Sequence, residues 1–338
     1  MEKRFSGCLM ITLGLILVVS LILNFGFLAY IGEKVTGESS SSLSVKRTYF
    51  EEKFHSGNPK SKEGTIAIIN LTGVIGNEIP GMIGESMVED AKLKLTQARE
   101  DADVKAIVLS IDSPGGEVLA SDDLYRAVMK VRAVKPVVCY FGSVAASGGY
   151  YTAMGSSYIV ANELSITASI GVIMQTMNFK DLMDKVGVKA LTFKSGKMKD
   201  LLNPTRDPNP EEMKLIQDLI NETYDKFVGI VASERKLDET ALRQGIADGR
   251  ILSGKQALKE KLVDELGDLD TAIQKAEKLG KVTDPKVMEY EAPFHWNQFF
   301  KRLGKSDVGA LHVTLPTNAL SLQTGRLYYL SPHLFGRE

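Results

Sequence analysis

The chain has 338 residues, and its 41 lysine and arginine residues balance 42 aspartate and glutamate residues, which gives a formal net charge of −1. This balance lacks the basic excess typical of nucleic-acid-binding domains, so we expect no nucleic-acid partner. Only two cysteines occur, Cys8 and Cys139, and their separation predicts neither a disulfide framework nor a metal site.

The strongest change in composition lies at the start of the chain. Residues 8–31 carry no charge, and as a helix they would be about 36 Å long, enough to cross a bilayer core of about 30 Å. Lys3 and Arg4 precede this run, which favours a cytoplasmic N-terminus at residues 1–7. We therefore expect a single-pass, uncleaved transmembrane anchor, with the bulk of the chain outside the cytoplasmic membrane. A cleaved signal peptide is the alternative, although Leu28-Ala29-Tyr30 is a poor cleavage site.

The rest of the chain divides by composition into three parts. Residues 32–64 are polar and rich in serine, which is typical of a linker. Residues 65–280 carry the strand and helix patterns of one folded domain, and residues 281–338 form a C-terminal extension.

Short apolar runs alternate with helical patterns along the folded domain. The runs predict buried strands at 66–71, 106–111, 137–141 and 158–161, with further strands at 171–175 and 189–193. The helical patterns fall at 117–131, 148–154 and 210–235, with several short helices between 237 and 280. This alternation predicts an α/β fold with a mostly parallel, buried sheet and flanking helices.

Glycines follow two of the predicted strands directly, in Asp112-Ser113-Pro114-Gly115-Gly116 and in Ser147-Gly148-Gly149. Glycine allows backbone N–H groups to approach a ligand closely. Gly116 and Gly148 are therefore candidates for the two donors of an oxyanion hole beside a nucleophilic Ser147. The alternative is that both glycine pairs only form tight turns.

A serine nucleophile needs a base, and the usual imidazole is missing from the domain. All four histidines (His55, His295, His312 and His333) lie outside residues 65–289. Lys199 is the remaining candidate, although the same lysine-rich segment is also typical of a solvated loop. Because a carboxylate beside the base would favour its charged form, we expect Asp200 to face away or to pair elsewhere.

Several motifs in order resemble the signal peptide peptidase A family of serine proteases: residues 112–116, 143–150, 166–172, 195–200, 249–257 and 262–267. The resemblance covers residues 65–280 and implies a ClpP/crotonase-like fold in the short, single-domain form of the family. It also implies that Ser147 is the nucleophile, that Lys199 is the general base and that Ser169 orients the lysine. Gly116 and Gly148 would form the oxyanion hole. Ala168 and Met198 depart from the residues common in the family but remove no reacting group.

The same resemblance implies a membrane-anchored serine endopeptidase that needs neither a cofactor nor a metal. Its substrates would be remnant signal peptides and other short apolar or unfolded peptides, with small or aliphatic side chains near the cut. The resemblance also implies that identical protomers assemble into a ring. We therefore hypothesise that Ser147 and Lys199 meet across a protomer boundary.

The apolar, aromatic segment 325–330 has two interpretations. It is either a packed or disordered chain end, or a tail that enters the substrate groove as a self-inhibitor and is trimmed there.

Other functions remain as alternatives. A crotonase-type acyl-CoA enzyme would need catalytic carboxylates, and a ClpP-type peptidase would need a histidine within the domain. A membrane-anchored scaffold or quality-control peptidase of the same fold is the third. Residues 249–255 have the spacing of a phosphate-binding loop, but Gln256 replaces the Ser or Thr that would hold magnesium. Ser253 and Gln256 are instead expected to form a capping box, so ATP use is not expected.

Overall fold

The computed structural model describes residues 17–18, 20–21, 24, 50–76, 86–291 and 327–330. The chain divides into two units, residues 1–48 and 49–338. Within the described residues, no helix is both long and apolar enough to cross a membrane. The predicted anchor at 8–31 lies almost entirely outside the described residues, as do residues 1–7 and most of the linker, so these predictions stay predictions.

One nine-stranded sheet forms the centre of the second unit, in the order β1-β10-β2-β3-β5-β6-β9, with β7 and β8 continuing from β5. All neighbours along the β10-to-β9 path are parallel, whereas β1 is antiparallel to β10 and β8 to β7. The strands are β1 (Glu51–Gly57), β2 (Thr65–Thr72), β3 (Val104–Ser113), β5 (Val137–Ala146), β6 (Tyr158–Ala161), β7 (Ile166–Ala168), β8 (Ile251–Ser253), β9 (Glu265–Leu266) and β10 (Lys286–Glu291). The predicted mostly parallel α/β architecture is confirmed.

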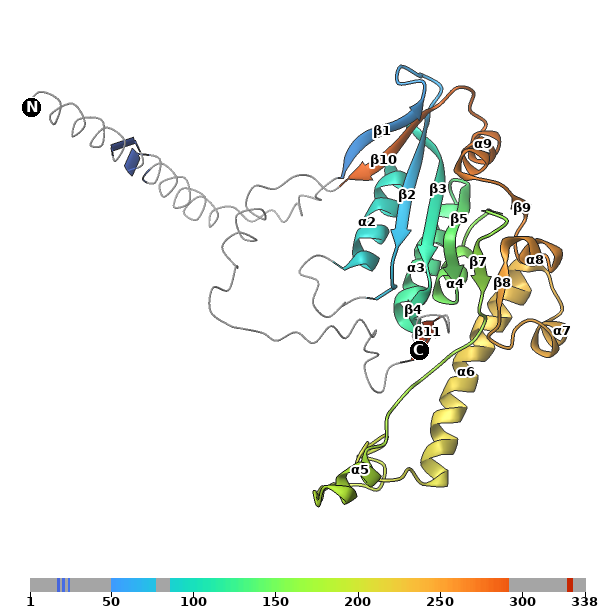
Figure 1. Cartoon of the computed structure of the whole chain (residues 1–338). Coiled ribbons are helices and arrows are strands. Elements are labelled where there is room, and N and C mark those ends of the chain that lie inside the picture. Colours follow the sequence, from blue (N-terminus) through green and yellow to red (C-terminus); the bar gives the residue numbers. More distant parts are fainter. Residues whose placement is uncertain are drawn as a thin grey trace, which may run out of the picture. The chain divides into compact units, whose positions relative to one another are not determined.

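Helices cover both faces of this sheet (Figure 1). On one face lie α2 (Met87–Glu100), α3 (Val118–Arg132), α4 (Gly148–Ala153) and the C-terminal part of α6 (Pro210–Arg235), and on the other lies α9 (Leu269–Gly280). Successive strand residues point to opposite faces, so Leu109 packs in the first layer and Val108 under α9. This double burial explains why the central strands are continuous apolar runs.

Two short helices, α7 (Glu239–Gln244) and α8 (Gly254–Lys259), complete the body. The side chain of Ser253 accepts a hydrogen bond from the Gln256 N–H, and the Ser253 N–H donates one to Gln256 Oε1, so the predicted capping box is confirmed.

The sheet extends past the predicted domain range of 65–280 on both sides, because β1 and β10 pair with each other at its edge. β1 is exposed along almost its whole length and carries charged residues, so its sequence resembles a polar linker. An edge strand of this kind gives no buried-strand signal.

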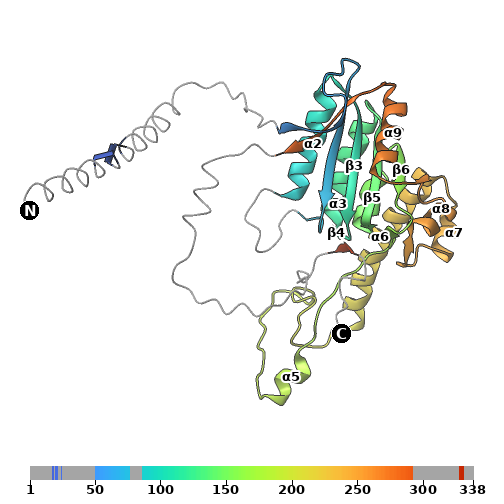
Figure 2. The ribbon, with the colours of Figure 1, turned by 45° about the horizontal axis from the view of Figure 1, so that its top comes forward.

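Residues 171–209, called the arm from here on, leave the sheet after β7, pass through α5 (Lys180–Lys185) and return to the start of α6 (Figures 1 and 2). The strands predicted at 171–175 and 189–193 are wrong. Both segments lie in the arm, where only Ile173 forms a bridge, to Tyr328. An apolar run forms a strand only where another strand offers hydrogen bonds to it.

Candidate active site

Ser147 joins the end of β5 to the start of α4 and has an unusual backbone conformation, with φ 54° and ψ −113°. Residues other than glycine rarely adopt positive φ, and such strain persists only where the surroundings enforce it. Its N–H donates to the Ala168 carbonyl oxygen at 2.8 Å, which fixes the turn. Its Oγ is buried and finds no hydrogen-bond partner among the described residues. A buried hydroxyl without a partner costs about 1–3 kcal/mol, so this atom calls for an explanation.

The two predicted oxyanion glycines lie against each other beside this turn. A Cβ placed on Gly148 would lie 3.0 Å from the Gly116 nitrogen, and one placed on Gly115 would lie 2.7 Å from the Gly148 nitrogen. Gly116 belongs to β4 (Gly115–Glu117), whose outward N–H and carbonyl groups bond to Ile75 on one side. Because successive N–H groups of a strand point to opposite sides, the Gly116 N–H faces away from Ile75, toward the edge of β4 along which residues 328–330 pair. The structure therefore brings Gly116, Gly148 and Ser147 together.

Ser169 lies beside Ser147 because β7 runs parallel to β5 in register. Ala168 pairs with Ala146, so the next residues of the two strands are Ser169 and Ser147. Ala168 and Ser169 also have positive φ, 64° and 52°, and the Ser169 N–H donates to the Arg250 carbonyl oxygen. Ser169 is thus a buried neighbour of the serine turn, and its predicted role in orienting the lysine stays a prediction.

A segment from the C-terminal region occupies the edge of β4. β11 (Tyr328–Leu330) pairs antiparallel with β4, with Tyr329 opposite Gly116. On its other side, Tyr328 exchanges two backbone hydrogen bonds of 3.0 Å with Ile173 at the base of the arm. An extended peptide is thus held between two strand-like edges. This pairing fits both interpretations of segment 325–330, a packed chain end and a tail that enters the substrate groove.

The side chain of Tyr329 fills an aromatic pocket. Its ring stacks on Tyr151 at 4.9 Å between centroids and lies 4.7 Å from the ring of Phe227, and its hydroxyl donates to the Thr223 carbonyl oxygen at 3.2 Å. Its own carbonyl oxygen would lie 2.0 Å from a Cβ on Gly115. The peptide carbonyl after this tyrosine therefore lies beside the two glycine turns.

A buried carboxylate supports the floor of this pocket. Asp122 accepts a hydrogen bond from the Tyr151 hydroxyl at 2.7 Å and pairs with Arg126 and Lys226. Burial alone would raise the pKa of Asp122, but the hydrogen bonds from Lys226, Tyr151 and Arg126 outweigh it, so the pKa is lowered. This pocket was not predicted from the sequence, because Tyr151 and Phe227 have the spacing of ordinary core residues.

Lys199 is not brought to Ser147 within one chain. It lies in an exposed turn of the arm, where its N–H donates to the Gly196 carbonyl oxygen at 3.1 Å. Its ammonium group makes no hydrogen bond or ion pair with any described residue. Asp200 pairs with Arg206 and Lys194, which confirms that this carboxylate is engaged elsewhere.

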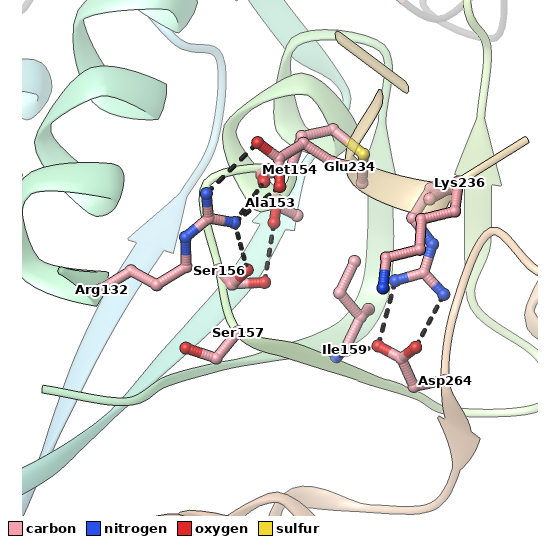
Figure 3. Close-up of a pocket in the computed structure, with 10 residues that line it drawn as sticks. Arg132, Ala153, Met154, Ser156, Ser157, Ile159, Glu234, Lys236 and Asp264 are labelled. Atoms are coloured by element: carbon pink, nitrogen blue, oxygen red, sulfur yellow. Dashed lines mark hydrogen bonds and ion pairs between the residues drawn. The ribbon is translucent and has the colours of Figure 1, made fainter. Parts of the chain in front are cut away.

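A pocket with a volume of about 450 Å³ is a separate feature (Figure 3). It lies where α3, α4 and α6 end, whereas α3 and α4 begin at the glycine turns. Four of its five charged residues are paired with each other, Arg132 with Glu234 at 2.7 Å and Arg235 with Asp264 at 2.8 Å. Arg132 also donates to the Ser156 carbonyl oxygen at 2.9 Å. Cations at helix ends are stabilising there, so this pocket has a structural explanation.

No described group of three or more His, Cys, Asp or Glu side chains could hold a metal ion. His55, the one histidine within the described ranges, lies on the edge strand β1 and contacts Glu289 at 2.7 Å.

The sequence of this chain is similar to those of known proteins. Residues 129–283 match the profile described as peptidase family S49, a range that contains Ser147, Ser169 and Lys199. A protein of Enterococcus faecium named "Putative signal peptide peptidase SppA" is 40% identical over 199 residues, which are 59% of this chain and 58% of that protein. "Putative protease slr0021" of Synechocystis sp. is 40% identical over 222 residues, or 66% of this chain and 76% of that protein. "Serine protease SPPA, chloroplastic" of Arabidopsis thaliana is 36% identical over 216 residues, or 62% and 31%. The chain thus spans little more than half of the Enterococcus relative.

Proposed function

The chain belongs to peptidase family S49, and on that premise we propose that it is a serine endopeptidase in which Ser147 attacks the peptide carbonyl. The observation that carries this proposal is the buried Oγ of Ser147, which lies beside the glycine turns and has no hydrogen-bond partner among the described residues. A hydroxyl held without a partner at a strained turn is ready to transfer its proton to a base that arrives from elsewhere. Gly116 and Gly148 would then donate their N–H groups to the oxyanion.

Lys199 is the base in this proposal. It accepts the Ser147 proton as the serine oxygen bonds to the carbonyl carbon, and that proton then passes to the leaving amine. Lys199 next deprotonates the water that hydrolyses the acyl-enzyme. Transfer of a lysine from water into an enclosed site disfavours its charged form. Ser169, beside Ser147, would hold the amine in position.

Because Lys199 lies on the arm, we propose that a second protomer supplies it within a homo-oligomeric ring. The arm and the first half of α6 expose large apolar side chains, which are Met177, Phe179, Leu182, Val186, Val188, Leu191, Phe193, Met213, Leu215 and Leu219. Exposed apolar surface of this extent is typical of a protein–protein interface. Packing the arm on a neighbour would bury these side chains and place Lys199 at the neighbour's Ser147.

The proposed substrates are extended apolar peptides, including remnant signal peptides. The position of β11 supports this class, because it shows an extended strand held by backbone hydrogen bonds beside the glycine turns. Strand addition of this kind recognises unfolded chains. We expected small or aliphatic side chains near the cut, whereas the pocket beside Gly116 holds a tyrosine ring, so we propose that aromatic residues are accepted there. The bound segment would act as a self-inhibitor.

We further propose that residues 8–31 anchor the enzyme in the cytoplasmic membrane with the peptidase domain outside. The uncharged run and the preceding Lys3 and Arg4 support this location.

The distance of Lys199 from the serine turn favours one rival, a catalytically minor scaffold of the same fold. To separate the two, Ser147→Ala and Lys199→Ala proteins are assayed with a fluorogenic peptide, alone and mixed under conditions that allow subunit exchange. We expect each variant to lose at least about 10³-fold in kcat, and the mixture to regain activity. The intact mass of Ser147→Ala protein, compared with wild type, reports whether the C-terminal region is trimmed by the same serine. Two variants with wild-type activity would support the scaffold, and inactive mixtures at every ratio would exclude a shared dyad.

A further inference from the structure

We propose that Arg206 is a positioning residue for Lys199, which it serves by joining the turn that carries the lysine to the start of α6. This inference rests on the proposed function, in which Lys199 is the base. It concerns a residue that contacts neither the substrate nor Ser147.

The guanidinium of Arg206 binds Asp200 in the turn on one side and Glu212 at the start of α6 on the other. Toward the turn, Nε and Nη2 donate to the two carboxylate oxygens of Asp200, both at 2.9 Å, and Nη2 also donates to the Asp200 backbone carbonyl at 3.1 Å. Toward the helix, Nη1 donates to Glu212 Oε2 at 2.9 Å. A planar guanidinium suits this double carboxylate contact, and an ammonium group does not.

The helix end of this connection is rigid. Glu212 lies in the first turn of α6 and forms a capping box with Asn209, in which each residue's N–H donates to the other's side chain at 2.9 Å. Its side chain is only 2% exposed, although the adjoining arm is largely open to solvent. The fixed helix start therefore holds Glu212, which holds Arg206.

The turn end is equally defined. Backbone hydrogen bonds from Lys199 to Gly196, from Leu201 to Met198 and from Asn203 to Asp200 close the turn. Arg206 binds both the side chain and the carbonyl oxygen of Asp200, the residue next to Lys199. The orientation of the lysine backbone thus follows from the position of Arg206.

Charge gives Arg206 a second role. A free carboxylate beside Lys199 would favour the ammonium form, which cannot accept a proton. Here Arg206 and Lys194 engage Asp200, and their hydrogen bonds lower its pKa, so it stays ionised and paired.

Apart from Lys199 itself, the charged groups that form ion pairs around the turn and the helix start balance. They are Lys194, Lys197 and Arg206 against Asp200, Glu211 and Glu212, and the nearby Lys180 pairs with Asp207. Removal of Arg206 would leave one excess negative charge next to the base.

The test uses the full-length oligomeric enzyme and pH profiles of kcat/KM. We expect Arg206→Met to lower kcat/KM at neutral pH about tenfold or more and to move the acidic limb of the profile up by about one pH unit. The KM should change little, because the groove is untouched. Arg206→Lys should recover part of the loss. The matched control is Lys180→Met, which removes another ion pair of the arm, with Asp207, and should stay within about twofold of wild type.

A double variant separates positioning from folding. If Asp200→Asn is added to Arg206→Met, the carboxylate next to Lys199 disappears and the charge balance of the turn is restored, so the acidic limb should return toward its wild-type position. A merely structural role for Arg206 predicts no such return. The inference is overturned if Arg206→Met keeps the wild-type profile, or if its loss is equal at every pH and accompanied by loss of assembly. Lys199→Ala is measured in parallel. An active Lys199→Ala enzyme would refute the proposed base itself, whereas an inactive one with an unaffected Arg206→Met enzyme would refute only the positioning role.

Discussion

The serine groove and the arm differ in how far one chain can complete them. In the groove, Ser147, Ser169, Gly116 and Gly148 are all buried and are fixed by a parallel sheet and backbone hydrogen bonds. The arm carries Lys199 on an exposed turn and displays apolar side chains to solvent. The nucleophile is therefore preorganised by the fold of one chain, whereas the proposed base lies on a part whose surface calls for a partner.

The largest expected difference between the two regions is the loss of stability when a glycine is replaced by alanine. A Cβ on Gly116 would lie 1.8 Å from the Ile75 carbonyl oxygen, a backbone atom that cannot move aside, whereas one on Gly196 in the arm meets nothing within 4 Å. We expect Gly116→Ala to destabilise the fold by more than about 4 kcal/mol, and Gly196→Ala to change it by less than about 0.5 kcal/mol. Urea unfolding of the two variants checks this. Equal stabilities would mean that the β4 edge is as open as the arm.

The next comparison uses two phenylalanines. Phe227 is fully buried against Tyr151 and Tyr329, so Phe227→Ala should cost about 3–4 kcal/mol in unfolding free energy. Phe193 is 94% exposed, so Phe193→Ala should leave the stability of the isolated chain within about 0.5 kcal/mol. If the arm packs on a neighbour, Phe193→Ala should instead weaken assembly and reduce peptidase activity. Sedimentation velocity measures the assembly, and the fluorogenic assay measures the peptidase activity. An intact, fully active oligomer of Phe193→Ala would remove the arm surface from the interface.

The same two regions mark how far the sequence predicts the fold. The strands at 66–71, 106–111 and 137–141 are confirmed, because burial on both faces requires continuous apolar runs. The apolar runs at 171–175 and 189–193 have the same composition but lie in the arm, without neighbouring strands. An apolar run indicates that its side chains must be buried. It does not indicate whether they pack against a strand of the same chain or against another protein.

The site divides in the same way. Two glycine turns and a serine at strand-to-helix junctions are local features, so sequence reasoning placed Gly116, Gly148 and Ser147 near one another. The aromatic pocket of Tyr151 and Phe227 joins residues far apart in the sequence, and so does the pairing of Tyr329 with Gly116. Such contacts depend on the topology of the whole sheet. The role of Arg206 was not predicted, because a single arginine in a polar segment resembles any solvated charged residue.

The smallest expected effect is that lowering the pH weakens the attachment of the arm but not the central sheet. Hydrogen bonds from Arg206 and from the Asn209 N–H lower the pKa of Glu212 to about 2, below its ordinary value of 4.5, although burial opposes this. A carboxylate with a lowered folded pKa contributes its full stabilisation above the unfolded pKa and loses it as the pH falls toward the folded value. The link between the arm and α6 should therefore weaken between about pH 4.5 and pH 2, whereas strands β3 and β5 are held by apolar burial. Hydrogen exchange, corrected for intrinsic rates, should show residues 194–209 losing protection on going from about pH 6 to pH 3. Residues 104–113 should remain protected over that range.

In Glu212→Gln, the arm should already be less protected at about pH 6 and should change less on acidification. Parallel loss of protection in both segments would show that the arm and the sheet open as one unit, and the distinction between a rigid groove and a separately held base would then fail.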